Sequence, residues 1–151
     1  MAKRRIRIPP DRSGERQHFI CEKLRVEKYF PFMQCDLRRD LLVCRGSITP
    51  SEGCNPYALS ISYKRGGIPA VYITDPEIKP RVEYHMYKEG NLCLYDWREE
   101  PWRAKMKIHE TIIPWTAEWL VFYELWKLTG EWHGVASSHG TNGKKQQAVY
   151  E

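Results

Sequence analysis

Cys93 is the residue of this sequence best suited to covalent chemistry. It lies between two leucines in the segment EGNLCLYDW, two residues after the Gly90-Asn91 pair and eight residues after His85. A thiol is a strong nucleophile near neutral pH, and the thioester it forms stays reactive towards amines. Because side chains alternate along an extended segment, Leu92 and Leu94 can anchor it in a core while Cys93 points outward. The competing interpretation is that Cys93 is a small buried hydrophobic residue.

Two roles are open for His85. It can orient the cysteine segment as a hydrogen-bonded structural residue, or it can act as a base. A cysteine hydrolase would instead pair Cys93 with His109 or His133, but no local pattern fixes a base or an oxyanion hole. The motifs of zinc deaminases and of Gly-rich phosphate loops are absent from the sequence. The sequence therefore predicts neither a metal site nor a bound cofactor.

The remaining cysteines show no sign of a shared site. The total of five is odd, the spacing is irregular and no C-x-x-C occurs, which argues against a disulfide framework and against a zinc site with paired ligands. His133 and His139 are six residues apart, but no cysteine pair upstream matches them. We expect four cysteines to be structural and without partners: Cys21, Cys35, Cys44 and Cys54.

The composition is that of a folded globular protein. Of the 151 residues, 42% are hydrophobic and 28% are charged, so residues 1–151 are expected to form a single domain around one core. No apolar run approaches the roughly 20 residues of a membrane span. The basic start is not followed by the apolar stretch of a secretory signal, and we expect a cytoplasmic protein.

Charge gives little reason to expect nucleic-acid binding. The net charge is +5, and its densest cluster lies in the first ten residues, at Lys3, Arg4, Arg5 and Arg7. A short charged terminus is more often solvated, and no nucleic-acid-binding motif follows it. We expect residues 1–10 to be a flexible basic arm and residues 137–151 to be a flexible polar tail.

The first half of the chain predicts a helix followed by a small sheet. Asp11 to Phe30 has helical spacing, with Ile20 and Leu24 on one face, and Pro31 ends it. Three strands are then expected, because short apolar runs alternate with turns rich in Pro, Gly, Ser and Asn. They cover residues 41–48, 57–64 and 70–74. In the second, Tyr57, Leu59, Ile61 and Tyr63 face one side, and the short turns favour an antiparallel meander.

The second half predicts an irregular segment and then a helix. Residues 75–113 contain three prolines as well as Cys93, and a long irregular stretch in a compact domain is usually functional. The segment from Pro114 to Gly130 is a strong helix prediction, with a first-turn proline and a C-terminal glycine. Its apolar residues surround the helix, so we expect burial on more than one side, with the aromatic stripe from Trp115 to Trp126 as core. The fold class is therefore α+β, with helices on a sheet.

This order of elements resembles the ubiquitin-conjugating enzymes. The proline before the third strand (GGIPAVYI) and above all the segment HMYKEGNLCLY are similar to that family, in which a His-Pro-Asn element precedes a Gly-x-Leu-Cys-Leu loop. The segment PWTAEWLVFYELWKLTGEWHG resembles more narrowly the short bacterial conjugating-enzyme-like proteins of type II CBASS antiphage operons. The resemblance covers roughly residues 15–135. It departs at Met86 and Tyr87, which replace the proline and asparagine, and His85 is two residues closer to the cysteine than usual.

The resemblance implies a fold, a reaction and partners. It implies a ubiquitin-conjugating-enzyme-like domain that carries an acyl group as a thioester on Cys93, with His85 in the site. Asn91 is a candidate for the role of the missing asparagine. The implied partner is the cyclic-oligonucleotide synthase of the operon, a cGAS-like nucleotidyltransferase whose C-terminus is the acyl group, and an activating enzyme is a further candidate. The alternative is a non-catalytic adaptor of the same fold, in which Cys93 is buried and unreactive.

Overall fold

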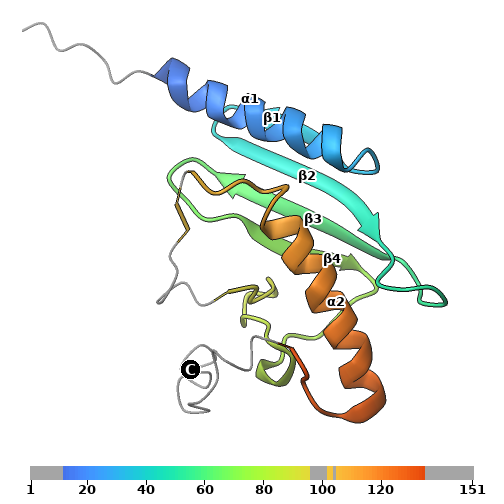
Figure 1. Ribbon diagram of the computed structural model, residues 1–151. Coiled ribbons are helices and arrows are strands. Elements are labelled where there is room, and N and C mark those ends of the chain that lie inside the picture. The colour runs from blue at the N-terminus through green and yellow to red at the C-terminus, as the bar shows by residue number, and fades with distance from the viewer. Residues whose placement is uncertain (1–11, 96–101, 104, 135–151) are drawn as a thin grey trace, which may run out of the picture.

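The computed structural model describes residues 12–95, 102–103 and 105–134, and its described part is an α+β structure (Figure 1). A four-stranded sheet has the order β1-β2-β3-β4, and every neighbouring pair is antiparallel. This confirms the predicted fold class and is consistent with a ubiquitin-conjugating-enzyme-like fold. The elements follow in the order α1 (Arg12–Tyr29), β1 (Gln34–Arg38), β2 (Leu41–Ile48), β3 (Tyr57–Lys64), β4 (Ala70–Asp75), the 3₁₀ helix η1 (Val82–Tyr84) and α2 (Ile112–Thr129).

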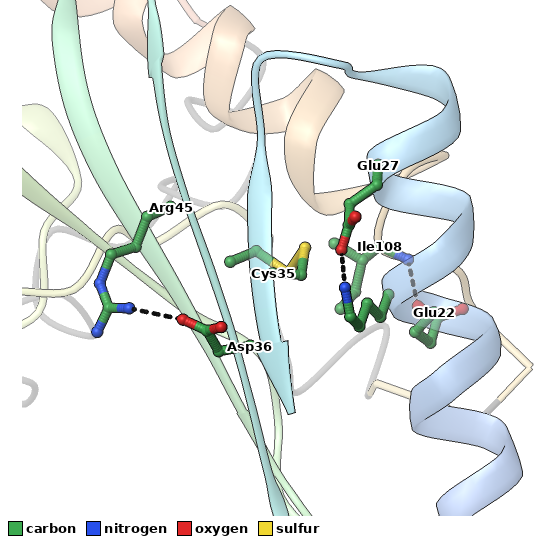
Figure 2. The surroundings of a disulfide bond; sticks show 8 residues. Glu22, Glu27, Cys35, Asp36, Arg45 and Ile108 are labelled. Carbon is green, nitrogen blue, oxygen red and sulfur yellow. Dashed lines mark hydrogen bonds and ion pairs between the residues drawn. A yellow bond between two sulfur atoms is a disulfide. The ribbon is translucent and has the colours of Figure 1, made fainter. Parts of the chain in front are cut away.

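The sheet has one strand more than the sequence predicted. Strand β1, with the sequence QCDLR, is short and mostly polar, so its own pattern does not identify it as a strand. It forms by pairing with β2, and an ion pair of 3.7 Å joins Asp36 to Arg45 across the two strands (Figure 2). The other three strands lie where they were predicted, and the inward face of β3 is confirmed in full.

The expectation that Cys35 and Cys44 have no partner is wrong. The two residues are directly opposite each other in the β1–β2 register, and a disulfide joins them (Figure 2). Both side chains are buried in the core. The pairing could not be seen in the sequence because it depends on the position of a strand that was not predicted.

Helix α1 buries a different face from the one that carries Ile20 and Leu24. Its buried residues are Phe19, Glu22 and Val26, whereas Ile20 and Leu24 are exposed. Both sets have helical spacing, so the spacing of apolar residues alone did not distinguish the two faces. The buried set includes an acidic residue, which is why hydrophobicity pointed to the wrong face.

Both helices pack on the same face of the sheet. The ring of Phe19 in α1 lies 5.0 Å from that of Tyr63, and the ring of Tyr123 in α2 lies 6.2 Å from that of Tyr57. The two sheet residues belong to the buried face of β3. Figure 1 shows α1 running along β1 and β2, while α2 crosses in front of β3 and β4. The core therefore lies between one face of the sheet and the two helices.

Helix α2 begins near Pro114 and ends at Gly130, as predicted. Gly130 has a left-handed backbone (φ 75°) and donates its N–H to the Trp126 carbonyl at 2.7 Å, which is a common helix end. Trp119 and Leu120 are buried. The expectation that the helix is buried on more than one side is wrong, because one side of it is exposed at Val121, Leu125 and Leu128.

The segment between β4 and α2 is irregular, as expected. In its described residues the structure has only η1 and two isolated β-bridges. Among the described residues, no helix combines the length and apolar character that crossing a bilayer requires. The predicted basic arm and polar tail lie outside the described residues.

Candidate active site

Cys93 lies at the base of a tight hairpin. The Tyr87 N–H donates to the Asn91 carbonyl and the Gly90 N–H donates to the Tyr87 carbonyl, both at 2.9 Å. At the open end, the Cys93 N–H donates to the carbonyl of His85, also at 2.9 Å. Gly90 makes the turn possible, because its φ of 94° is unfavourable for residues with a side chain. The eight-residue spacing of His85 and Cys93 is therefore the length of this hairpin.

The second strand of the hairpin is attached to the edge of the sheet. The Leu92 N–H donates to the Val71 carbonyl in β4 at 2.9 Å, and Asn91 forms an isolated bridge with Tyr72. The side chain of Leu92 is buried, and Leu94 packs against the core. Leu92 and Leu94 therefore anchor the segment on both sides of the cysteine.

His85 is held in an unusual backbone conformation. Its φ of 55° and ψ of 61° place it in the left-handed region at the end of η1. The side chain is buried, and its ring lies 5.1 Å from that of Trp132. Its carbonyl oxygen accepts the Cys93 N–H and also the indole N–H of Trp119, at 3.2 Å. The structure thus brings His85 and Cys93 together through a backbone hydrogen bond.

The Cys93 side chain is half-buried. Its Sγ lies 3.8 Å from the carbonyl oxygen of Tyr95, in the geometry of a weak S–H donor. The Tyr95 ring packs against Trp115 near the start of α2, with 5.5 Å between the ring centroids. Burial, helped by the neighbouring Cys93, raises the pKa of Tyr95 to about 12, so its hydroxyl is protonated and neutral at physiological pH.

Two residues of this region were missed as parts of the site. Trp119 was predicted as core, and it is 3% exposed, but its indole N–H also donates to the carbonyls of Tyr84 and His85. No sequence signal connects residues that lie 34 positions apart. Tyr95 could have been noticed, because it lies two residues after the cysteine and so on the same side of an extended segment.

The other predicted candidates contact different parts of the structure. The His109 ring stacks on Tyr29 at 4.6 Å, and its Nε2 lies 3.6 Å from Glu110. His133 lies 3.2 Å from the Thr129 hydroxyl. These contacts hold the ends of the two helices and give no support to a cysteine–histidine hydrolase. His139 lies outside the described residues.

The remaining cysteines are not equivalent to one another. Cys21 is a free cysteine and is exposed on α1. Cys54 lies in the turn between β2 and β3, with its Sγ 3.1 Å from the Ser51 hydroxyl. Across the described ranges, no group of three or more His, Cys, Asp or Glu side chains is placed to bind a metal ion.

Comparison with known proteins identifies a family. A family model described as E2-CBASS, type II CBASS E2 protein, matches residues 22–140. The matched range includes the sheet, the cysteine hairpin, α2 and the C-terminal part of α1. No curated protein matches the chain.

Proposed function

The chain belongs to the type II CBASS E2 proteins, and on that premise we propose that Cys93 carries an acyl group as a thioester. The observation that carries the proposal is the position of Cys93. Its N–H is bonded to His85 and the preceding residue, Leu92, is bonded to the sheet edge, while its thiol is half-buried at the base of a hairpin. A carrier cysteine needs an accessible thiol on a well-supported loop.

The reaction has two steps. In the first, the Cys93 thiolate attacks an activated acyl carbonyl, the carbon–sulfur bond forms and the activating group leaves with the electron pair of its bond. In the second, an amine attacks the thioester carbonyl, the thiolate leaves and an amide results after the amine loses a proton. The acyl group arrives already activated, from a separate activating enzyme.

We assign the acyl group to the C-terminus of the cyclic-oligonucleotide synthase, the cGAS-like nucleotidyltransferase of a CBASS operon. The family match supports a place among CBASS components. In this proposal the chain acts as one conjugating-enzyme-like domain in the bacterial cytoplasm, and the transfer serves antiphage defence.

Two neighbours of Cys93 have supporting roles. His85 acts through its backbone carbonyl, which holds the Cys93 N–H in place. Asn91 lies on the same side of its strand as Cys93, because Leu92 between them points into the core. Its carboxamide N–H is the donor that we assign to the oxyanion formed when the thioester is attacked.

Co-expression of the chain with the nucleotidyltransferase and the activating enzyme tests this function. We expect a species of higher mass on a non-reducing gel that disappears with thiol and also with neutral hydroxylamine. Thiols cleave thioesters and disulfides alike, whereas hydroxylamine cleaves thioesters and spares disulfides. The Cys93→Ser variant should give an ester that resists thiol, and Cys93→Ala should give no species.

The exposed thiol of Cys21 provides a matched control. Cys21→Ala should leave the conjugate unchanged, because a thioester on Cys93 does not involve α1. A species that survives hydroxylamine contradicts thioester transfer. If Cys93→Ala forms a non-covalent complex as tightly as the wild type, and if neither the wild type nor this variant gives a conjugate, the chain is an adaptor.

A further inference from the structure

One carbonyl group connects Cys93 to helix α2. The His85 oxygen accepts the Cys93 N–H at 2.9 Å and the Trp119 indole N–H at 3.2 Å. The same indole N–H lies 3.0 Å from the carbonyl oxygen of Tyr84. Trp119 is 3% exposed, so this donor is shielded from water and its hydrogen bonds do not compete with solvent.

The adjacent residues Leu92 and Cys93 are held by different parts of the structure. Leu92 is attached to β4 through the Val71 carbonyl, and Cys93 is attached to His85. The left-handed backbone of His85 is a sparsely populated conformation, which persists only where surrounding contacts hold it. The hydrogen bonds from Trp119 to residues 84 and 85 are contacts of this kind.

Packing alone does not explain a tryptophan at position 119. Its ring stacks on Tyr123, with centroids 5.2 Å apart and planes 10° apart, and it forms a T-shaped pair with Tyr84, with centroids 6.5 Å apart. A phenylalanine can make similar ring contacts, but it has no N–H to donate. The ring of Trp119 therefore serves the packing of the core, whereas its indole N–H serves the backbone that holds Cys93.

We infer that Trp119 is a positioning residue for Cys93, acting through the carbonyl of His85. Its N–H fixes the backbone from which the Cys93 thiol projects, so that the orientation of the thiol is set by α2 as well as by the sheet. The inference rests on the proposed function to the extent that Cys93 is the acyl carrier. Its structural part, the coupling of residue 119 to residue 93, is measurable without any acyl donor.

The test is the Trp119→Phe variant, with Trp126→Phe as its matched control. Trp126 lies on the same helix and in the same aromatic cluster, and its indole N–H has no acceptor among the described residues. Residue-resolved amide hydrogen exchange, followed by NMR, compares the N–H of Cys93 with that of Leu92. We expect exchange at Cys93 to accelerate about fivefold relative to Leu92 in Trp119→Phe, the factor that one typical hydrogen bond is worth.

A merely structural role gives a different pattern. General destabilisation would accelerate both amides equally, because Leu92 and Cys93 are adjacent and unfold together. An unchanged ratio of the two rates in Trp119→Phe, or an equal change of that ratio in Trp126→Phe, overturns the inference. If Trp119→Phe does not fold, the wild-type protein decides. Its Trp119 indole N–H should exchange at least about tenfold more slowly than that of Trp126, and equal rates overturn the inference.

Conjugate formation separates this inference from the proposed function. With the nucleotidyltransferase and the activating enzyme present, Trp119→Phe should slow formation of the Cys93 conjugate about fivefold and Trp126→Phe should leave it unchanged. A conjugate formed at the wild-type rate by Trp119→Phe overturns the inference and leaves the function intact. If the wild type forms no conjugate, the proposed function fails, and the exchange ratio still decides whether Trp119 positions Cys93.

Discussion

The carboxylate of Glu22, in the middle of α1, accepts a hydrogen bond of 2.9 Å from the backbone N–H of Ile108 (Figure 2). Glu22 is 1% exposed, and Arg25 lies 3.3 Å from its other oxygen. The bond ties α1 to the segment that leads into α2. Glu22→Ala should lower the free energy of unfolding by about 2–3 kcal/mol, because it leaves a buried N–H without an acceptor. Urea unfolding measures the loss.

Glu27 on the same helix is the matched control. It pairs with Lys23, and both side chains are about one third exposed, where an ion pair contributes at most about 1 kcal/mol. Glu27→Ala should therefore cost clearly less than Glu22→Ala. Equal losses would show that the Glu22–Ile108 bond has no special part in stability.

Stability should fall in alkaline solution because of Tyr57. Its hydroxyl donates to Glu124 and accepts from Lys127 at 3.0 Å, and burial, then the bond to Glu124, raises its pKa from 10.0 to about 12. The unfolded chain thus loses this proton near pH 10 and the folded protein near pH 12. The stabilisation that the protonated Tyr57 hydroxyl gives to the folded protein is complete below pH 10 and is lost as the pH rises towards 12.

Thermal unfolding at a series of pH values from 8 to 12, with the Tyr57→Phe variant beside the wild type, measures this effect. Between about pH 10 and pH 12, the melting temperature of the variant should fall less than that of the wild type. The other tyrosines with a raised pKa (Tyr84, Tyr95 and Tyr123) are common to both proteins. Parallel curves would contradict the assignment to Tyr57.

The sequence was most informative where one pattern determines one structure. The alternation from Tyr57 to Tyr63 predicted both a strand and its buried face, and Pro114 and Gly130 predicted where α2 begins and ends. It failed where tertiary contacts decide. Strand β1 exists because β2 is beside it, and α1 turns Glu22 inward because Ile108 supplies a donor.

The candidate site was predictable in part for the same reason. The local sequence around Cys93 contains the turn glycine and the two anchoring leucines. In the structure Gly90 forms the turn, Leu92 is buried and Leu94 packs against the core. The contribution of Trp119 depends on a hydrogen bond between residues 34 positions apart, and no local pattern encodes it. The disulfide between Cys35 and Cys44 was missed because register, and not spacing, brings the two residues together.

Gly90→Ala should distort the cysteine hairpin. An added Cβ meets only the Pro80 side chain, at 4.0 Å, so the cost comes from the backbone, whose φ is 94°. We expect a loss of about 1–2 kcal/mol in stability and slower conjugate formation on Cys93. Gly53→Ala is the control, since its φ is 84° in a turn remote in sequence and an added Cβ contacts nothing within 4 Å. It should lower stability similarly and leave the conjugate unchanged, and an equal loss of conjugate in both variants would argue against a local effect.

His85→Asn distinguishes the carbonyl of His85 from its imidazole. Asparagine tolerates the left-handed conformation that His85 adopts (φ 55°) and keeps the backbone oxygen, but it has no ring that can accept a proton. If His85 acts through its carbonyl, the variant should form the Cys93 conjugate within about threefold of the wild-type rate, with the same dependence on pH. Loss of general-base catalysis would instead slow it about 10²–10⁴-fold. A β-branched residue has the opposite effect on the backbone: His85→Val should cost about 1–2 kcal/mol of stability and slow the reaction, because the His85 carbonyl can no longer hold the Cys93 N–H. A rate that falls by two orders of magnitude in His85→Asn, with the protein still folded, would make the imidazole the working part of this residue.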